Sequence, residues 1–252
     1  MNVSLMAIEG LPEFGPGADI AALVTEGATR AGVPIQRGDI VVVTQKIVSK
    51  VEGQLVRLAD VAPSPFSTAW GAAHHCDPRL IELVLRESRR IVRMDRGLLI
   101  TETHHGLVCA NSGVDVSNVE GGEVAAILPK DPDASARRIR DAIVARVGHD
   151  VAVVISDTFG RPWREGLVNV AIGAAGLAPL QSYVDARDPR GFALKSTVQA
   201  LADEVAAASG LIARKLNRVP AVIVRGVSYD SANKAGGGAK DLIRPPERDL
   251  FR

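Results

Sequence analysis

Apolar, β-branched runs alternate with stretches of helical periodicity along the chain, and this pattern predicts a mixture of strands and helices. Three runs rich in Val and Ile are expected to form strands: one ending near Thr44, one from Val151 into Asp157, and one from Pro220 to Val227. Continuous apolar runs of this kind are typical of strands covered on both faces. Their spacing is uneven, which favours mixed sheets with flanking helices in two lobes over simple βαβ winding. We therefore expect an α+β fold.

Helical segments are marked by residues that commonly begin and end helices. Asp19 is expected to cap a first helix that ends near Gly32, and Ser135 to cap a helix that reaches Val147. Further helices are predicted over 78–94 and 197–215, and a hairpin of strands near 97–103 and 106–110. The segments 60–78 and 129–135 are predicted to be irregular and to mark boundaries between the lobes.

Composition limits the function classes. A chain of 252 residues, 46% of them hydrophobic, can bury a sizeable core. Its 30 Lys and Arg against 29 Asp and Glu give a net charge of +1, so binding to bulk nucleic acid or to a membrane surface is not expected. With no signal-peptide pattern and no apolar run of about 18 residues, we expect a cytoplasmic protein in which Cys76 and Cys109 stay thiols.

Asp157 and Thr158 follow an apolar run directly, and a Gly, a Pro and two arginines come within seven residues. Open sheets usually build their sites just beyond the carboxyl ends of such strands. A carboxylate beside a hydroxyl suits Mg²⁺ or Mn²⁺, and Arg161 and Arg164 are then available to hold oxyanions. The alternative is that Asp157 and Thr158 only satisfy backbone N–H groups of a turn.

Two further polar clusters also follow predicted strands. Asp115 and Asn118 lie in one loop, and Lys46 and Lys50 are four residues apart, a spacing that places both on one face of a helix. Taken alone, the first cluster can be ordinary turn formers and the second solvated lysines. Together with Asp157, they indicate metal-assisted phosphoryl chemistry on a nucleotide.

The usual phosphate-binding loop is missing. No G-x-x-x-x-G-K-[ST] motif occurs, because the Gly-containing segments at 191–197 and 236–240 both have the wrong spacing. No G-x-G-x-x-G motif follows a predicted strand either. A nucleotide would therefore bind without a P-loop.

Seven short blocks occur in a characteristic order over nearly the whole chain. They are EGLPEF (9–14), QKIVSK-x-EG (45–53), HGLVCANSGVDVSNV (105–119), ISDTFGRPWREG (155–166), NVAIGAAGL (169–177), LADEVAAASGL (201–211) and PAVIVRG (220–226). This order resembles the coenzyme F420-0:L-glutamate ligase family. The resemblance implies a GTP-dependent enzyme that adds L-glutamate to F420-0, the deazaflavin coenzyme precursor, through an acyl phosphate and extends a γ-linked tail.

The resemblance also assigns roles to matching residues. Asp115, Asp157 and Thr158 would bind the divalent metal, Mg²⁺ or Mn²⁺, and Lys50 and Asp157 would be catalytic. GTP would contact Lys50, Asn118 and the loop Gly10-Leu11-Pro12-Glu13, with Gln45 and Lys46 at neighbouring nucleotide-contact positions. A monovalent cation such as K⁺ is a further cofactor of the implied reaction. The family also implies a homodimer of single catalytic units, here expected to span 1–252 without a nitroreductase-like domain.

One block departs from the family. Where relatives commonly place a Met-Gly stretch with an acid that can serve a second metal, this chain has Ala213-Arg214-Lys215. A lysine cannot replace a carboxylate ligand. The resemblance therefore does not extend to a second metal held by this loop.

Several alternatives stay open at this level. The chain could instead be a phosphotransferase for another small carboxylic acid, or a non-catalytic sensor of metal and nucleotide. Trp163 is expected to pack under its loop rather than stack on the deazaflavin. Four arginines at helical spacing are expected to form a solvated helix face: Arg86, Arg89, Arg90 and Arg93.

Overall fold

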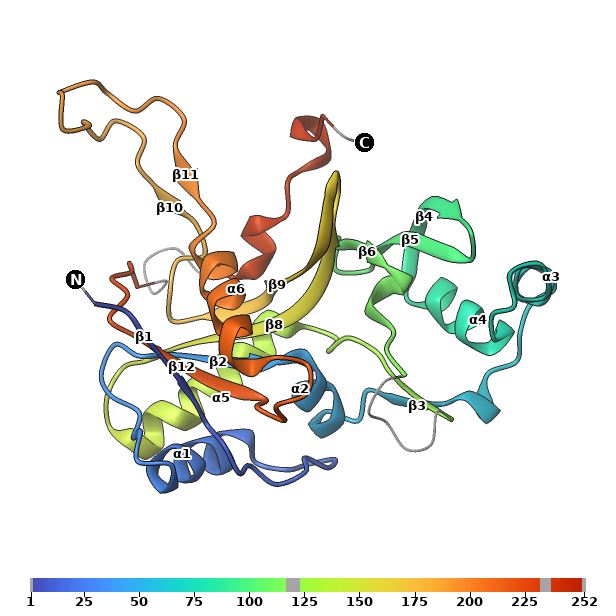
Figure 1. Ribbon diagram of the computed structural model, residues 1–252, viewed down its shortest axis with the longest axis horizontal. Coiled ribbons are helices and arrows are strands. Elements are labelled where there is room, and N and C mark those ends of the chain that lie inside the picture. The colour runs from blue at the N-terminus through green and yellow to red at the C-terminus, as the bar shows by residue number, and fades with distance from the viewer. Residues whose placement is uncertain (1, 117–122, 232–236, 251–252) are drawn as a thin grey trace.

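A mixed five-stranded sheet forms the centre of the computed structural model, which describes residues 2–116, 123–231 and 237–250 (Figure 1). The strands lie in the order β1 (Ser4–Ala7), β12 (Ala221–Arg225), β2 (Ile40–Thr44), β8 (Ala152–Arg161) and β9 (Arg164–Ala175). Only β2 and β8 are parallel, and the other pairs are antiparallel. The predicted α+β fold with mixed sheets is confirmed.

Helices cover both faces of this sheet. α1 (Ile20–Arg30) and α5 (Pro132–Val147) pack on one face, and α6 (Leu201–Ala213) packs on the other. Successive strand residues point to opposite faces. The first core accordingly takes Val41, Val43, Val153 and Ile155, and the second takes Ile40, Val42, Ala152 and Val154. This two-sided burial explains the continuous apolar runs, since each fully buried Val or Ile contributes about 1.5–3 kcal/mol.

A smaller unit lies to one side of the large sheet (Figure 1). At its base lies helix α2 (Gln45–Val51), next to the paired strands β3 (Leu55–Arg57) and β7 (Val124–Ala126). Two helices follow, α3 (Pro65–His74) and α4 (Pro78–Arg86). A sheet of three strands completes the unit: β4 (Ser88–Asp95), β5 (Leu98–Thr103) and β6 (Val108–Ala110). Two small cores lie within it, one around Leu58 and Leu83 and one around Ile81 and Leu99, whereas Ile47 of α2 belongs to the first core of the large sheet. A long hairpin with the short strands β10 (Gln181–Ser182) and β11 (Val198–Gln199) projects away from both units.

The strand that carries Asp157 is longer than predicted. Its last pair with β2 joins Ser156 to Thr44, but β8 continues to Arg161 because β9 supplies hydrogen-bond partners along its other edge. The predicted strand end at Asp157 is therefore wrong. Pro162 and Trp163 form the tip of the resulting β8–β9 hairpin, where Trp163 is 80% exposed, so its predicted packing under the loop is also wrong.

The predicted helix over 78–94 ends at Arg86, and the following residues form β4. The arginines expected on a helix face are therefore divided between two elements. Arg89 and Arg90 are ion-paired with Glu102 on β5, at 3.6 and 2.7 Å. Strand pairing with β5 gives the nearly buried Glu102 carboxylate its cationic partners, an arrangement that helical periodicity could not predict.

Two segments predicted to be irregular contain helix. Within 60–78, Ser64 caps α3 and Pro65 occupies its first turn. Within 129–135, Asp131 rather than Ser135 caps α5, accepting a 2.9 Å hydrogen bond from the Ala134 N–H. Proline is compatible with a first helical turn because that position needs no backbone N–H. The prolines in these segments therefore begin helices instead of interrupting them.

Two further expectations from the sequence concern the cysteines and membrane-spanning helices. Cys76 and Cys109 are free thiols, as predicted. Across residues 2–116, 123–231 and 237–250, no helix combines the length and apolar character needed to cross a membrane.

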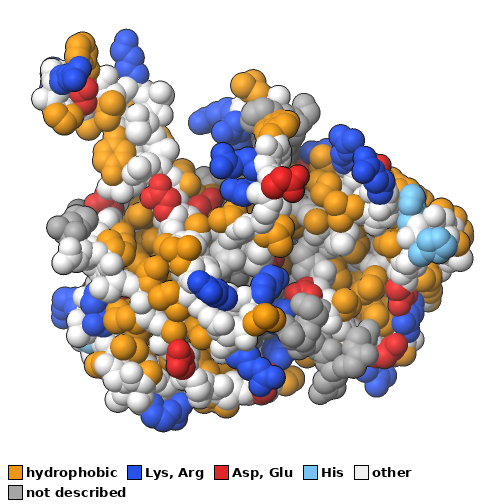
Figure 2. All heavy atoms as spheres, in the orientation of Figure 1, with side chains coloured by type: hydrophobic (Ala, Val, Ile, Leu, Met, Phe, Trp, Pro, Cys, Tyr) orange, Lys and Arg blue, Asp and Glu red, His pale blue; other side chains and the backbone are white. Residues whose placement is uncertain are grey.

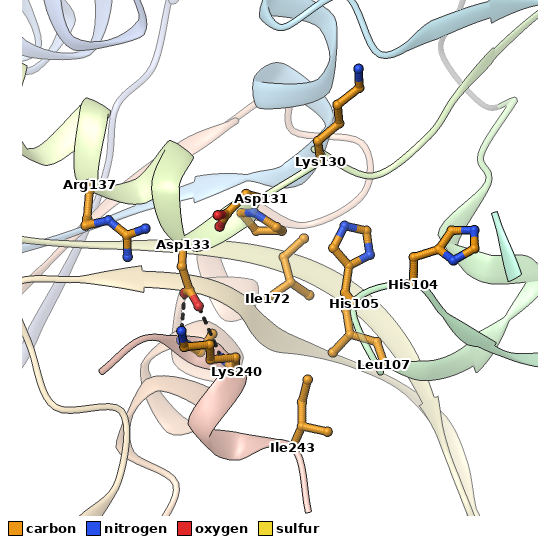
Figure 3. A pocket seen from close by; sticks show the side chains of 12 residues that line it. His104, His105, Leu107, Lys130, Asp131, Asp133, Arg137, Ile172, Lys240 and Ile243 are labelled. Atoms are coloured by element: carbon orange, nitrogen blue, oxygen red, sulfur yellow. Dashed lines mark hydrogen bonds between the residues drawn. The ribbon is translucent and has the colours of Figure 1, made fainter. Parts of the chain in front are cut away.

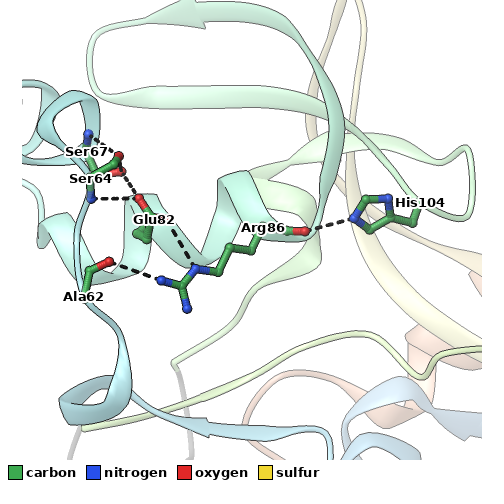
Figure 4. Close-up of polar contacts among 6 residues, drawn as sticks. All are labelled: Ala62, Ser64, Ser67, Glu82, Arg86 and His104. Carbon is green, nitrogen blue, oxygen red and sulfur yellow. Dashed lines mark hydrogen bonds and ion pairs between the residues drawn. The ribbon is translucent and has the colours of Figure 1, made fainter.

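Glu82 joins α3 to α4 through a compact hydrogen-bond network (Figure 4). Its carboxylate accepts hydrogen bonds from the Ser64 N–H at 2.9 Å and from the Ser67 hydroxyl at 2.8 Å. Arg86 donates to the same carboxylate at 3.3 Å and to the Ala62 carbonyl at 3.1 Å. Hydrogen bonds from Ser64, Ser67 and Arg86 lower the pKa of Glu82 from 4.5 to about 2.

Glu82→Gln is expected to lower the free energy of unfolding at pH 7 by about 1–3 kcal/mol, because hydrogen bonds to an ionised group are lost. A lowered pKa means that this contribution is complete above pH 4.5 and disappears as the pH falls toward 2. Urea unfolding at pH 7 and pH 3 measures it, with the exposed Glu26→Gln as the control. An equal difference between wild type and Glu82→Gln at both pH values would contradict this account.

Candidate active site

Asp115 and Lys46 meet at the carboxyl end of β2. Helix α2 begins directly after Thr44, and its Lys46 Nζ lies 2.9 Å from the Asp115 Oδ2. The backbone of Asp115 is fixed by two hydrogen bonds with Ala126, at 3.0 and 2.8 Å. An acid from the loop after β6 is thereby held against the first turn of α2.

Asp157 lies at the same end of the sheet, one residue beyond the last β2–β8 pair. Burial raises the pKa of Asp157 to about 6, and repulsion by the Asp115 carboxylate acts in the same direction. The Thr158 N–H, which donates a 2.8 Å hydrogen bond, and the ammonium groups of Lys215 and Lys46 act against this rise in pKa. The structure thus brings together two carboxylates and two lysines that are far apart in the sequence.

A divalent cation shared by Asp115 and Asp157 would neutralise the charge of the two carboxylates. Two like charges in a partly buried site repel each other, and a shared cation removes that repulsion. Within the described part of the chain, no three His, Cys, Asp or Glu side chains form a complete metal-binding group. A cation at Asp115 and Asp157 would therefore take its other ligands from water, hydroxyls or substrate oxygens, as Mg²⁺ commonly does beside phosphates.

Thr158 points away from this carboxylate pair. Adjacent strand residues project to opposite faces, and the Thr158 hydroxyl donates a 2.9 Å hydrogen bond to the Asn169 Oδ1. Asn169 packs against Gly210 of α6, where an added Cβ would lie 3.1 Å from its Nδ2. The structure therefore separates the Thr158 side chain from the pair formed by Asp115 and Asp157, and its role as a metal ligand stays a prediction.

Lys50 links α2 to the predicted nucleotide loop. Its Nζ lies 3.2 Å from the Glu13 Oε2, one helical turn along from Lys46. Gly10, at the start of this loop, has a φ of +68°, a conformation that glycine adopts without strain. Leu11 and Pro12 connect Gly10 to Glu13 in this loop. Each lysine of α2 thus contacts an acid from a different loop.

Gln45 has a positioning role in this structure. Its side chain is 3% exposed and donates to the Ser49 hydroxyl at 2.6 Å and to the Ile127 carbonyl at 3.3 Å. Ser49 also donates to Ile127, at 2.6 Å. These bonds hold α2 against the segment that follows β7. A contact between Gln45 and a nucleotide stays a prediction, and Asn118 lies outside the described residues.

Two residues near Asp157 were not predicted to belong to the site. The sequence identifies Lys215 only as a residue that cannot replace a carboxylate ligand, yet its ammonium group interacts electrostatically with Asp157. Cys109 is buried beside Asp157, and burial together with that carboxylate raises the pKa of its thiol to about 12. Cys109 therefore stays protonated and unreactive at neutral pH. One indication in the sequence that Cys109 lies near the site is that Cys109 belongs to the same block as Asp115.

Residues 10–226 match the family model described as F420-0:Gamma-glutamyl ligase. The chain belongs to the F420-0:gamma-glutamyl ligase family. The match includes the loop that begins at Gly10, helix α2, and the acids Asp115 and Asp157. The predicted membership of this family is confirmed, and so is the predicted enzyme class, a ligase that forms C–N bonds.

Curated relatives of this ligase are similar over 88–100% of their length. A protein of Methanothermobacter thermautotrophicus named coenzyme F420:L-glutamate ligase is 44% identical, covering 100% of each chain. Proteins with the same name are 43% identical in Methanopyrus kandleri, with 98% of each chain covered, and 40% identical in Methanocaldococcus jannaschii, with 88% covered. The similarity therefore extends through both units of the fold.

Gly113 shapes the loop that carries Asp115. It has a φ of +69°, and an added Cβ would lie 2.9 Å from the Cδ2 of Leu128, which is only 3% exposed. Gly113→Ala is expected to lower the free energy of unfolding by about 2–4 kcal/mol, from the left-handed conformation and from overpacking. Gly148, at φ +75° with no neighbour within 4 Å, provides the control.

Urea unfolding of both variants measures this difference. Gly148→Ala is expected to cost only the conformational part, about 1–2 kcal/mol. A loss for Gly113→Ala no larger than that of Gly148→Ala would show that contact with Leu128 does not constrain the Asp115 loop.

Proposed function

We propose that this ligase joins L-glutamate to the deazaflavin coenzyme precursor F420-0, using GTP and Mg²⁺ or Mn²⁺, with K⁺ as an additional cofactor. The observation that carries the proposal is the meeting of Asp115 and Asp157 beside two lysines at the carboxyl end of β2. The names of the relatives support the substrate, since each is called a coenzyme F420:L-glutamate ligase.

The chemistry requires activation of a carboxylate, which does not condense with an amine in water. In the first step, a carboxylate oxygen of F420-0 attacks the γ-phosphorus of GTP, the bond to the β-phosphate oxygen breaks, and GDP leaves. In the second step, the glutamate amine attacks the acyl carbon, the amide bond forms, and phosphate leaves with the C–O bonding electrons. The amine loses its proton in this step.

The residues of this chain would act mainly through charge. A cation held by Asp115 and Asp157 supplies positive charge to the γ-phosphoryl group when it is bound. Lys46 and Lys50 lie one turn apart on α2 and would neutralise the triphosphate on the same side. Their present partners, Asp115 and Glu13, hold both ammonium groups at this edge of the sheet.

A homodimer is part of the proposal. The long hairpin with β10 and β11 projects from the body of the molecule, and Figure 2 shows hydrophobic side chains exposed along it. Phe192 is 69% exposed there, with Val184 and Val198 at 44% and 47%. Large apolar side chains on a projecting segment commonly mark a protein interface. A second copy of the chain would cover them.

Asp157→Asn is expected to reduce glutamate-dependent GDP release on the order of 10²- to 10³-fold, since a group that positions charge in the transition state is lost. Removing a charge from a partly buried site should not unfold the protein. The assay combines GTP, Mn²⁺, F420-0 and L-glutamate and follows GDP and product mass, with Asp95→Asn on the surface strand β4 as the control.

This assay also separates the alternative functions. A phosphotransferase would release GDP without glutamate, and a nucleotide sensor would release none. Near-normal turnover by Asp157→Asn would refute the assignment of this site.

Phe192→Asp is expected to convert a dimer into a monomer, because a charge would be buried in the proposed interface. Light scattering coupled to size-exclusion chromatography measures the mass. Leu211→Asp is the matched control, since Leu211 on α6 is also 69% exposed but lies outside the hairpin. A Phe192→Asp protein with the wild-type mass would count against dimerisation through this hairpin.

A further inference from the structure

A cavity of about 270 Å³ lies between the two units of the fold (Figure 3). Its walls come from the β5–β6 turn, the first turns of α5, β9 and the short 3-10 helix η5 (Ala239–Leu242). Figure 3 shows Arg137 on one side of the cavity and His104 and His105 on the other. None of these three residues belongs to the predicted site.

The cavity contains more positive charge than its own acids neutralise. Lys130, Arg137 and Lys240 line it, and no side-chain hydrogen bond or ion pair connects these three to any residue within 2–116, 123–231 and 237–250. Asp131 is engaged as the cap of α5, through the Ala134 N–H.

Asp133 is the other acid of this cavity, and backbone groups already surround its carboxylate. It accepts hydrogen bonds from the N–H groups of Ala174, Ala239 and Lys240, at 2.9, 2.7 and 3.3 Å. These bonds fix η5 against α5 and β9. The ammonium and guanidinium groups of the cavity are therefore left to bind an anion from outside.

His105 adds a hydrogen-bond acceptor. Its Nε2 lies 2.8 Å from the Pro129 carbonyl oxygen. A carbonyl only accepts, so Nε2 carries the proton, and Nδ1 of the neutral ring is an acceptor. This Nδ1 is buried and has no hydrogen-bond partner in the described part of the chain. Buried polar atoms normally have a partner, so a ligand with an N–H group suits this position.

The cavity lies next to the carboxylate pair. Ile172 lines it and is two residues from Val170, the register partner of Asp157, a distance of about 7 Å along the strand. Val170 and Ile172 pack on the same core, so the cavity and the Asp157 side chain lie on one face of the sheet. On the other side, Lys130 follows Ala126, which holds Asp115, by only four residues.

We propose that this cavity binds the glutamate part of the reaction. Arg137 and Lys240 would hold its carboxylates, and the His105 Nδ1 would accept a hydrogen bond from its nitrogen. Small-molecule sites usually measure about 300–1,000 Å³, so the cavity suits an amino acid better than a deazaflavin. The ligand is free L-glutamate or the first residue of a γ-linked tail. This inference rests on the proposed function, which supplies the identity of the anion.

Calorimetric titration of the full chain tests binding without any turnover. L-glutamate and the dipeptide γ-L-glutamyl-L-glutamate are titrated into wild type, Arg137→Gln, Lys240→Met and the control Arg37→Gln, an exposed arginine on a distant loop. We expect at least a tenfold loss of affinity in the two cavity variants and none in the control. Since neither altered side chain has a partner within the described residues, both variants are expected to fold.

The two ligands identify the source of the carboxylate. Cavity-dependent binding of L-glutamate assigns the incoming amino acid, and cavity-dependent binding of the dipeptide alone assigns the tail. Wild-type binding that the cavity variants do not change, or no binding of either ligand, overturns the proposal. If binding behaves as expected but the wild type makes no glutamate-dependent product, the proposed function fails while the cavity assignment stands.

A second comparison tests the role of His105. Glutarate has both carboxylates of glutamate but no amine. Wild type should bind L-glutamate more tightly than glutarate, and His105→Phe should lose this preference, because the phenyl ring keeps a flat ring at this position but has no acceptor. An unchanged preference in His105→Phe would overturn the assignment of this acceptor.

Discussion

The burial of the Asp157 carboxylate near that of Asp115 is the constraint that the rest of the site must satisfy. Two acids would not stay close in a partly buried site without positive charge, and the chain supplies it from α2 and from the end of α6 through Lys46 and Lys215. The arrangement depends on the parallel pair β2 and β8, because only parallel strands place the start of α2 and Asp157 at the same edge of the sheet.

The rest of the site depends on how the smaller unit is attached to the sheet. Ser49 and Gln45 bind the Ile127 carbonyl, and Ala126 holds the backbone of Asp115, so one short segment fixes the acid relative to α2. The same segment continues to Lys130, which lines the cavity between the two units. The proposed nucleotide site and the cavity proposed for glutamate would therefore share one connection, which would suit the proposed reaction of an acyl phosphate with an amine.

The sequence predicted the parts of this arrangement that local pattern controls. Buried strands, the fold class and the lysine pair on α2 follow from periodicity and spacing. The misassigned parts depend on contacts between distant residues: β9 extends β8 past Asp157, and β5 converts an apparent helix into β4. The Thr158 hydroxyl hydrogen-bonds to Asn169, a contact that the sequence pattern does not show, and its role as a metal ligand stays a prediction. The cavity could not be predicted because its residues come from four separate segments and form no motif.

The most direct test is a crystal structure of the full chain grown with Mn²⁺ and a non-hydrolysable GTP analogue, in which anomalous scattering locates the metal. This account predicts a manganese ion in contact with carboxylate oxygens of both Asp115 and Asp157 and with the γ-phosphate, and ammonium groups of α2 beside the triphosphate. Manganese bound elsewhere, or a nucleotide with its phosphates away from these two acids, would contradict it.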